Sequence, residues 1–260
     1  MKIATFNVNS LKVRMENLKI WLKEADPDVV CLQETKSTDE TFPRTELEDL
    51  GYNLAIHGQK TYNGVALLSK HPLEDVRIGL PGDDGDEQAR YIEAVIPAGD
   101  TVLRVASIYL PNGNPVDTDK FPYKLRWMER LKAHAAELLT YEEPLVLAGD
   151  YNVIPTADDV YDEKAWEGDA LTQPQSRAAL RNIINLGFTD AFRACHAEPH
   201  RYTFWDYQAG RWQKGQGIRI DHLLLSPQAA DRLTACDIDI EPRGREKPSD
   251  HTPIWAKLAF

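Results

Sequence analysis

The sequence predicts an α/β fold in which two packed β-sheets lie between outer layers of helices. Two observations lead to this prediction. Short runs of aliphatic and β-branched residues alternate with segments of helical periodicity along the whole chain of 260 residues. Most of these runs are nearly continuous in apolar residues, which is typical of strands covered on both faces, and they fall into two groups with helical segments around them.

Eight runs have the composition of strands. The last of them alternates apolar and polar residues, which is typical of a half-buried strand that closes a sheet. In chain order they are residues 2–7, 28–33, 64–69, 91–96, 101–110, 145–149, 218–225 and 253–259.

Three segments have the periodicity of helices. Residues 11–25 carry leucines and a methionine on one face and end before Asp26-Pro27, where a helix cannot easily continue. Residues 119–140 repeat apolar side chains at helical spacing. Residues 176–186 are expected to begin with Ser176 as N-cap and to end at Gly187.

Composition limits the class of protein. Apolar residues make up 42% and charged residues 27% of the chain, which excludes disordered and fibrous classes. The formal charge of −11 argues against broad, non-specific coating of DNA, because Lys and Arg contacts to phosphate supply most of that affinity. The charge does not exclude a local basic rim or a carboxylate site that binds a cation.

The chain shows no feature of a membrane or secreted protein. No apolar run approaches the roughly 18 residues that span a bilayer, and the first residues lack the order of a secretory signal. The three cysteines, Cys31, Cys195 and Cys236, have no metal-ligand spacing and fit a reducing compartment. We therefore expect a cytoplasmic monomer that folds as one domain over residues 1–260 and has no membrane partner.

Polar residues end or interrupt the apolar runs at corresponding places. Each could be an ordinary turn or cap residue when taken alone, but Asp221 lies inside an apolar run, where an unpaired carboxylate costs several kcal/mol. His251 is the expected partner of Asp221. The full set is Asn7, Glu34, Tyr109, Asp150, Asn152, Asp221, Asp250 and His251.

This set fits the hydrolysis of a phosphate ester. Glu34, supported by Asn7, supplies the kind of oxygen ligand that Mg²⁺ prefers, and no Cys/His cluster indicates structural zinc. Asp150 suits the base that deprotonates water, with Asn152 positioning it. A protonated His251 held by Asp221 would donate to the phosphoryl oxygens, and Tyr109 would donate to the phosphate or the leaving oxygen.

The motifs that contain these residues resemble those of exodeoxyribonuclease III and the related apurinic/apyrimidinic endonucleases, in the superfamily that includes DNase I. The matching segments occur in the family's order and extend over nearly the whole chain. They include IATFNVNSL (3–11), DVVCLQETK (28–36), IYLPNG (108–113), LAGDYNVIP (147–155), GIRIDHLLLS (217–226) and SDHTPI (249–254).

The resemblance implies a DNase I-like four-layer αββα sandwich of two mixed β-sheets. It also implies a divalent-metal-dependent DNA repair nuclease that uses Mg²⁺, with Mn²⁺ as a substitute. The expected activities are 3′→5′ exonuclease on duplex DNA, incision 5′ to abasic sites, and 3′-phosphatase or 3′-phosphodiesterase. The expected partner is duplex DNA, including abasic and 3′-blocked ends.

The resemblance also implies roles for individual residues. The implied catalytic residues are Tyr109, Asp150, Asn152, Asp221 and His251. The implied metal-binding residues are Asn7, Glu34, Asp150, Asn152, Asp250 and His251. Asn112 matches a phosphate-contacting residue and Arg90 one that grips the DNA backbone. Two departures stand out: Asn9 replaces an Asp of some relatives, and residues 218–220 replace a segment in which some relatives carry a Trp of the abasic-sugar pocket.

Segment 202–217 interleaves aromatic, basic and glycine residues, which predicts a loop that enters a DNA groove with an aromatic wedge. The alternative is that its first aromatic residues belong to the core. Basic residues of the helix 119–140 could track a DNA strand or form an ordinary solvated face. The predicted DNA-binding residues are Tyr62, Arg90, Asn112, Lys120, Lys124, Trp205, Tyr207 and Trp212.

Two other function classes are alternatives to a DNA nuclease. A phosphatase or phosphodiesterase of the same superfold could act on inositol phosphates or phospholipids, but the GDYN and RIDH motifs and the aromatic loop favour duplex DNA. A non-enzymatic scaffold would have lost at least one catalytic residue, and none is missing. The relative strength of the expected nuclease activities stays open, because all of them use the same residues.

Overall fold

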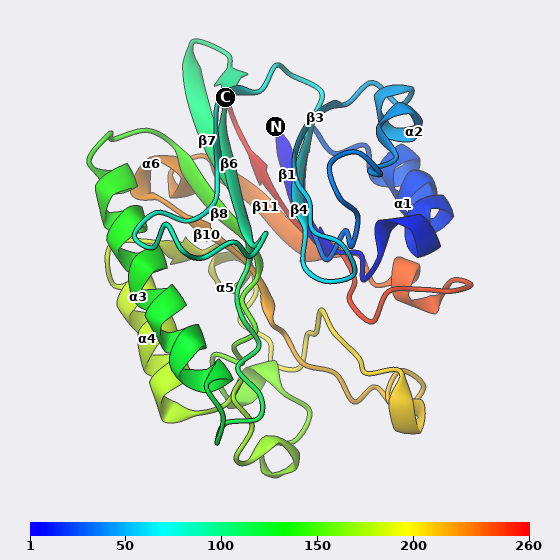
Figure 1. Cartoon of the computed structure of the whole chain (residues 1–260), viewed down its shortest axis with the longest axis vertical. Helices are drawn as coiled ribbons and strands as arrows, with labels where there is room; N and C mark the ends of the chain where they lie inside the picture. Colours follow the sequence, from blue (N-terminus) through cyan, green and yellow to red (C-terminus); the bar gives the residue numbers. More distant parts are fainter.

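The computed structural model describes residues 1–260 and contains two six-stranded mixed β-sheets that pack face to face (Figure 1). The first sheet has the strand order β11 (Leu233–Ile238), β12 (Ile254–Leu258), β1 (Lys2–Asn7), β2 (Val29–Gln33), β4 (Val65–Ser69), β3 (Asn53–His57). The second has the order β5 (Glu74–Ile78), β6 (Tyr91–Ala98), β7 (Thr101–Tyr109), β8 (Leu145–Asp150), β10 (Asp221–Leu225), β9 (Thr189–Asp190).

Helices cover the outer face of each sheet, so the predicted four-layer αββα sandwich is confirmed. On the first sheet lie α1 (Leu11–Ala25) and α2 (Arg44–Glu48); on the second lie α3 (Lys120–Leu139) and α4 (Pro174–Ile184). The short helices are α5 (Ala191–Cys195), α6 (Pro227–Ala230), η1 (Ala157–Asp159), η2 (Glu163–Trp166), η3 (Gln208–Gly210) and η4 (Glu241–Gly244). None of the helices has both the length and the apolar character needed to cross a membrane.

Alternation along the buried strands creates three apolar layers. In β1, Ile3 faces the second sheet, whereas Ala4 and Phe6 face α1. Cys31 of β2 likewise points into the space between the sheets, and its neighbour Leu32 points outward to the helices. The near-continuous apolar character of these strands therefore reflects burial on both faces.

Two details of the predicted elements are corrected. Ser176 is not an N-cap: α4 begins at Pro174, whose fixed φ suits the first turn, and the Ser176 hydroxyl donates instead to Ala170 O at 2.7 Å. The predicted strand 218–225 begins only at Asp221, because Ile218 pairs with Val160 and Phe204 in isolated bridges outside the ladder.

Four strands, β3, β5, β9 and β11, were not predicted. The residues of β5 are all exposed, and its register shifts against β6, so it has no apolar pattern to reveal it. The edge strand β11 mixes polar and apolar residues. Strands of this kind are stabilised by pairing with a neighbour more than by their own composition.

Strand direction brings the polar strand ends together. β1 and β2 run parallel, as do β7 and β8, so the carboxyl ends of each pair lie at one edge of their sheet. The amino end of β10 pairs with the end of β8 through Asp221 and Asp150, and β12 begins just after His251. β1 runs away from the N-terminus, which lies near the C-terminus in Figure 1, so this edge is remote from both chain ends.

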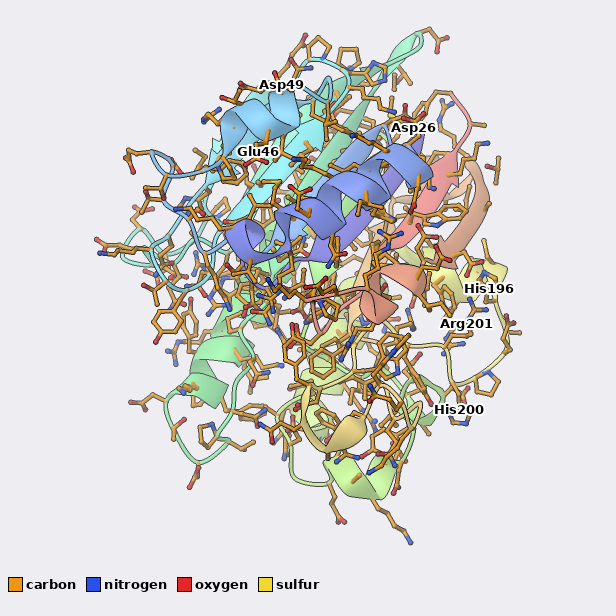
Figure 2. The ribbon with its side chains drawn as sticks, turned by 90° about the vertical axis from the view of Figure 1, so that its right-hand side faces the viewer. Asp26, Glu46, Asp49, His196, His200 and Arg201 are labelled. Carbon is orange, nitrogen blue, oxygen red and sulfur yellow. The ribbon has the colours of Figure 1, made fainter.

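Part of the negative charge of the chain lies on the outer helical layer of the first sheet. Figure 2 labels Asp26, which follows α1, and Glu46 and Asp49 of the α2 segment. The same view labels His196, His200 and Arg201 along the segment that follows α5. The formal charge of −11 is thus not confined to the edge where the polar strand ends meet.

Candidate active site

Carboxylates from both sheets meet at Asn7, the last residue of β1. The Asn7 amide donates to Glu34 Oε1 at 2.9 Å and to Asp150 Oδ2 at 3.0 Å. Glu34 follows β2 of the first sheet, and Asp150 ends β8 of the second. The buried amide of Asn7 therefore joins the two sheets at the site and fixes the separation of the two acids.

His251 lies between two aspartates. Its Nδ1 is 2.9 Å from Asp221 Oδ2, and its Nε2 is 3.7 Å from Asp150 Oδ2. Burial alone would lower the pKa of His251, but Asp221 and Asp150 outweigh it and raise the pKa to about 10. The predicted pairing of Asp221 with His251 is present, and the two aspartates favour the protonated form of the imidazole.

The environment of Asp150 makes it a weaker acid than an exposed aspartate. Burial raises its pKa to about 7, with Asp221 and Glu34 acting in the same direction and protonated His251 opposing them. Its Oδ1 accepts the backbone N–H of Asn152 at 2.9 Å. A carboxyl group with a pKa near neutrality is suited to accept and release a proton during a reaction.

Glu34 has the opposite shift. Burial would raise its pKa, but Lys36, whose ammonium lies 2.9 Å from Glu34 Oε2, and the Asn7 amide together hold it below the ordinary value. Glu34 has a left-handed backbone with a φ of 52°, which turns the chain sharply after β2. This turn accounts for a charged side chain so close to the end of a buried strand.

The site can accommodate a hard metal ion. Glu34, Asp150 and His251 each offer one ligand atom, and these atoms all lie within 4.8 Å of one another. In addition, Asp221 Oδ1 is buried without a hydrogen-bond partner. A set dominated by carboxylate oxygens suits Mg²⁺ or Mn²⁺ better than it suits a soft metal.

The other predicted metal ligands lie close to this cluster. Asp250, next to His251, accepts the Asn9 amide at 3.0 Å, and Asn9 Oδ1 accepts Lys36 Nζ at 2.6 Å. Asn9 thus connects Asp250 to the lysine that pairs with Glu34. Lys36 was not among the predicted site residues. Its position two residues after Glu34 was the feature of the sequence that could have indicated this pairing.

Two carboxamides stand beside Asp150. The Asn112 amide donates to Asn152 Oδ1 at 3.0 Å, and the Asn152 amide donates to Leu110 O at 2.9 Å. Asn152 has a left-handed backbone, with a φ of 48°. The side chains of Asn112 and Asn152, from the loops after β7 and β8, therefore form one hydrogen-bonded unit next to the carboxylates.

The structure corrects the prediction that Lys124 contacts DNA. Its side chain is fully buried, and Nζ donates to the carbonyl oxygens of Asn112 and Asn152 at 3.0 and 2.5 Å. Burial lowers the pKa of Lys124 to about 7, with Asp150 and Asp169 opposing the shift. Lys120, one turn earlier on α3, is exposed as predicted for a residue of the rim.

Tyr109 and Arg90 line a hollow of about 480 Å³ beside Glu34. The Arg90 guanidinium stacks over the Tyr109 ring at 4.7 Å, and its Nε donates to Gln88 Oε1 at 2.7 Å. Burial and the charges of Glu34 and Asp150 raise the pKa of Tyr109 well above its usual value, so the phenol remains a donor. Tyr62 also lines this hollow and is 69% exposed.

The aromatic segment 202–217 is only partly available to a ligand. Trp205 is buried, packing edge-on against Trp212 at 4.9 Å, so the alternative that it belongs to the core is correct and a direct wedge role for it is not. Tyr207 is 46% exposed, and Trp212 is half-buried. The Tyr207 hydroxyl accepts Arg14 Nη2 at 2.9 Å, a contact that the sequence did not reveal.

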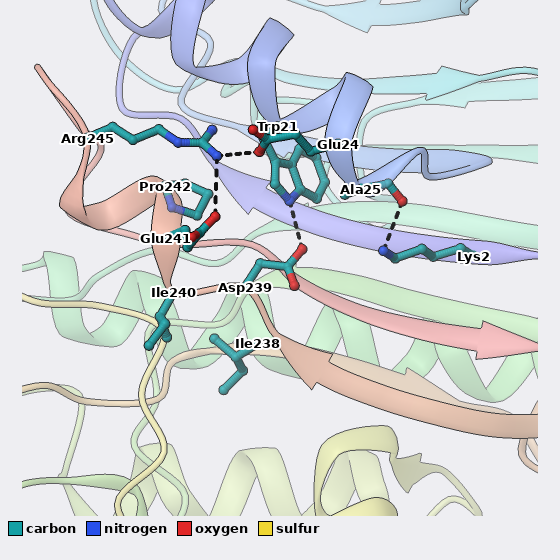
Figure 3. Close-up of a pocket in the computed structure, with 10 residues that line it drawn as sticks. All are labelled: Lys2, Trp21, Glu24, Ala25, Ile238, Asp239, Ile240, Glu241, Pro242 and Arg245. Carbon is teal, nitrogen blue, oxygen red and sulfur yellow. Dashed lines mark hydrogen bonds and ion pairs between the residues drawn. The ribbon is translucent and has the colours of Figure 1, made fainter.

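A second hollow, of about 420 Å³, lies between α1 and the η4 segment (Figure 3). Asp239 there accepts the Trp21 indole N–H at 2.8 Å, and Arg245 pairs with Glu24. None of the predicted site residues lines this hollow. Glu34, Asp150 and His251 instead gather at the edge where the two sheets meet.

Comparison with known proteins shows which proteins the chain is similar to. Exodeoxyribonuclease III of Haemophilus influenzae is 34% identical over 99% of this chain and 100% of its own length. DNA repair nuclease APEX1 of Danio rerio is 32% identical over 100% of this chain and 82% of its own.

Solved structures agree with these relatives in fold. An AP endonuclease from Archaeoglobus fulgidus superposes with a TM-score of 0.94 at 39% identity, with all of both chains covered. The 3′ phosphatase NExo from Neisseria, solved bound to a product DNA hairpin, gives a TM-score of 0.95 at 37% identity, again over all of both chains. The family model described as "Endonuclease/Exonuclease/phosphatase family" matches residues 4–251, and the chain belongs to this family.

Proposed function

We propose that this protein repairs duplex DNA by divalent-metal-dependent hydrolysis of phosphodiester bonds. It incises 5′ to abasic sites, degrades duplex ends 3′→5′, and removes 3′-phosphate or 3′-phosphodiester blocks. One activated water serves all of these reactions. In each of them the bond between phosphorus and a DNA 3′-oxygen breaks, and the reactions differ in the group that remains on phosphorus. The class of DNA repair nuclease rests on two relatives that match nearly the whole of this chain, exodeoxyribonuclease III and APEX1.

The observation that carries the proposal is the position of His251 between Asp221 and Asp150, at 2.9 and 3.7 Å. In the proposed reaction Asp150 accepts the proton of the attacking water, and the Asn152 amide orients that water. Protonated His251 donates to a non-bridging phosphoryl oxygen as negative charge builds there. Tyr109, kept protonated by its surroundings, donates to the phosphate or the leaving oxygen.

We propose Mg²⁺ as the cofactor, with Mn²⁺ as a substitute. Glu34 and Asp150 would hold it through carboxylate oxygens, with Asn7, Asn152 and Asp250 around them, whereas His251, which keeps its proton in the proposed reaction, would contact the phosphate. When bound, the ion supplies positive charge that polarises the phosphoryl group. The support for a hard cation is the oxygen-rich donor set and the low pKa of Glu34, which keeps this carboxylate ionised.

We propose duplex DNA as the partner, held by an exposed rim around the site. The candidates for this rim are the exposed Tyr62, Asn112, Lys120 and Tyr207 and the half-buried Arg90 and Trp212. The protein is proposed to be a one-domain monomer of the cytoplasm. The free thiols of the buried Cys31 and Cys236 support a reducing compartment.

A product assay on four oligonucleotide substrates tests the proposal: an abasic duplex, a 3′-recessed duplex, a 3′-phosphate duplex and an RNA–DNA hybrid. We expect cleavage of the abasic and 3′-recessed duplexes and phosphate release with Mg²⁺ or Mn²⁺, and loss of these reactions with EDTA. Full activity in EDTA would contradict the metal assignment. Phosphate release from an inositol polyphosphate without cleavage of any DNA would favour the alternative substrate class.

A further inference from the structure

We propose that Lys124 is a positioning residue that sets the geometry of Asn112 and Asn152 from inside the protein. This inference rests on the proposed function, since its consequence is measured on DNA hydrolysis. Lys124 lies in the second turn of α3, away from the substrate, and reaches two loops that end at the site. Its Nζ donates to Asn112 O at 3.0 Å and to Asn152 O at 2.5 Å.

The two contacts join the same pair of residues whose side chains already bond to each other. Asn112 donates through its amide to Asn152 Oδ1, so the pair is connected at the side chains and, through Lys124, at the main chain. Two connections of this kind restrict both the separation and the relative rotation of the residues. The amide of Asn152 is thereby held next to Asp150, whose Oδ1 accepts the Asn152 N–H.

The neighbouring chain is shaped to admit the lysine. Gly113 follows Asn112 with a φ of +91°, and a Cβ at this position would lie 2.7 Å from Lys124 Cδ and 3.2 Å from Ala170 Cβ. A side chain larger than hydrogen would therefore displace the lysine stem or the loop. The glycine thus meets two requirements: it adopts the left-handed backbone conformation, and it leaves space for the side chain of Lys124.

Burial of a lysine at this position costs free energy unless its amine forms hydrogen bonds that compensate for the lost hydration. The helix around it contributes Phe121, Trp127 and Met128 to apolar clusters, and an amine in such surroundings loses its hydration. An apolar side chain in place of Lys124 would leave the carbonyl oxygens of Asn112 and Asn152 without this hydrogen-bond donor. The left-handed backbone of Asn152, a conformation disfavoured for a residue with a side chain, would also lose one of its restraints.

The test compares Lys124→Met with substitutions elsewhere on α3. We expect Lys124→Met to lower kcat on an abasic duplex by about 10²-fold with little change in KM, because misplacement of a catalytic group by about 1 Å has effects of that size. Lys120→Met, on the exposed rim, should instead raise KM and reduce its salt dependence. Lys132→Met, whose lysine pairs with Glu129 on the same helix, is the control that leaves both constants unchanged.

A double-mutant cycle separates positioning from general stability. If Lys124 acts through Asn152, the double variant Lys124→Met/Asn152→Ala should lose no more activity than Asn152→Ala alone. In ¹⁵N spectra the side-chain amide resonances of Asn112 and Asn152 should move in Lys124→Met and not in Lys132→Met. Lys124→Gln, which keeps a shorter amide donor, should retain more activity than Lys124→Met.

Several outcomes would overturn the inference. A parent-like kcat in folded Lys124→Met, or multiplicative losses in the double variant, would show that the lysine does not act through Asn152. Failure of both Lys124→Met and Lys124→Gln to fold would assign the residue to stability alone. Absence of nuclease activity in the parent protein would instead remove the proposed function, so the two failures are distinguishable.

Discussion

Two clusters of buried charge lie near the start of β10. One contains Arg219 and the other contains Asp221, two residues later in the sequence. The catalytic cluster consists of Glu34, Asp150, Asp221 and His251, and the arginine cluster of Asp159, Asp190, Arg193 and Arg219. Both are built from aspartates in an apolar interior. They differ in how completely their charges are paired.

In the arginine cluster every carboxylate has a cation. Arg219 donates through Nε to Asp159 at 2.8 Å and through Nη1 to Asp190 at 2.9 Å, and Arg193 adds a second partner to Asp159. Burial would raise the pKa of Asp159, but these arginines outweigh it and hold the pKa at about 2. Asp190 also caps α5 by accepting the backbone N–H groups of Phe192 and Arg193.

In the catalytic cluster the acids outnumber the cations. Asp221 Oδ1 has no partner, and the pKa of Asp150 lies near 7 instead of 2. The comparison teaches that a buried aspartate becomes structural or reactive according to the cations that its neighbours supply. A fully paired carboxylate stabilises the fold, whereas an incompletely paired one is ready to bind a cation or a proton.

The largest effect is expected from Asp150→Asn. Removal of the proton acceptor should lower the rate of abasic-duplex cleavage by about 10²–10⁴-fold, with binding of the duplex nearly unchanged. Steady-state cleavage and a gel-shift titration measure the two quantities. Unchanged turnover would remove Asp150 from the reaction, and circular dichroism confirms that the variant is folded.

A substitution in the arginine cluster should instead lower the stability of the fold. Arg219→Met leaves two buried carboxylates short of a partner and should lower the free energy of unfolding by about 3–5 kcal/mol, measured in urea. Arg201→Met, which removes a half-exposed pair with Asp237 at 2.6 Å, is the control and should cost about 1 kcal/mol or less. Equal losses in the two variants would show that burial does not distinguish these pairs.

A metal ion should complete the pairing of the catalytic cluster and so stabilise the fold. At a Mg²⁺ or Mn²⁺ concentration of about 100 times Kd, the free energy of unfolding should rise by about 2.7 kcal/mol, and EDTA should reverse the increase. Glu34→Gln should reduce the shift in melting temperature on metal addition. A shift of the same size in Glu34→Gln would place the ion elsewhere.

The smallest effect concerns acid. The folded pKa of Asp159, about 2, lies below its ordinary value of 3.8, so its contribution is complete above pH 4 and is lost as the pH falls toward 2. The loss should be on the order of 2 kcal/mol, because one pKa unit corresponds to about 1.4 kcal/mol. Urea unfolding between pH 5 and 2 measures it. In Asp159→Asn this component of the acid dependence should be absent.

Much of the catalytic cluster could be predicted from sequence because strand ends reveal themselves locally. Asp150 and Asn152 follow an apolar run, and Asp221 interrupts one, so their unusual positions are visible without a structure. The parallel pairing of β7 with β8 then places such ends at one edge. The fold class followed from the same runs, because burial on both faces leaves a nearly continuous apolar signature.

Other features depend on segments that are distant in sequence. Lys124 and Lys120 are four residues apart, a spacing typical of a solvated face, but the loops at Asn112 and Asn152 cover Lys124 and leave Lys120 exposed. Trp205 is similar, because its burial depends on packing against Trp212. These contacts join residues that are distant in sequence, so no local sequence pattern predicts them.

Helix α3 also holds the loop that leads to Arg90. Tyr123 and Arg130 both bond to Asp86, and Arg130 also donates to the carbonyls of Leu80 and Pro81. Lys124 of the same helix holds Asn112 and Asn152. Helix α3 therefore contacts loops on both sides of the candidate site. A displacement of α3 would therefore move the loop before Arg90 and the loops of Asn112 and Asn152 in the same direction.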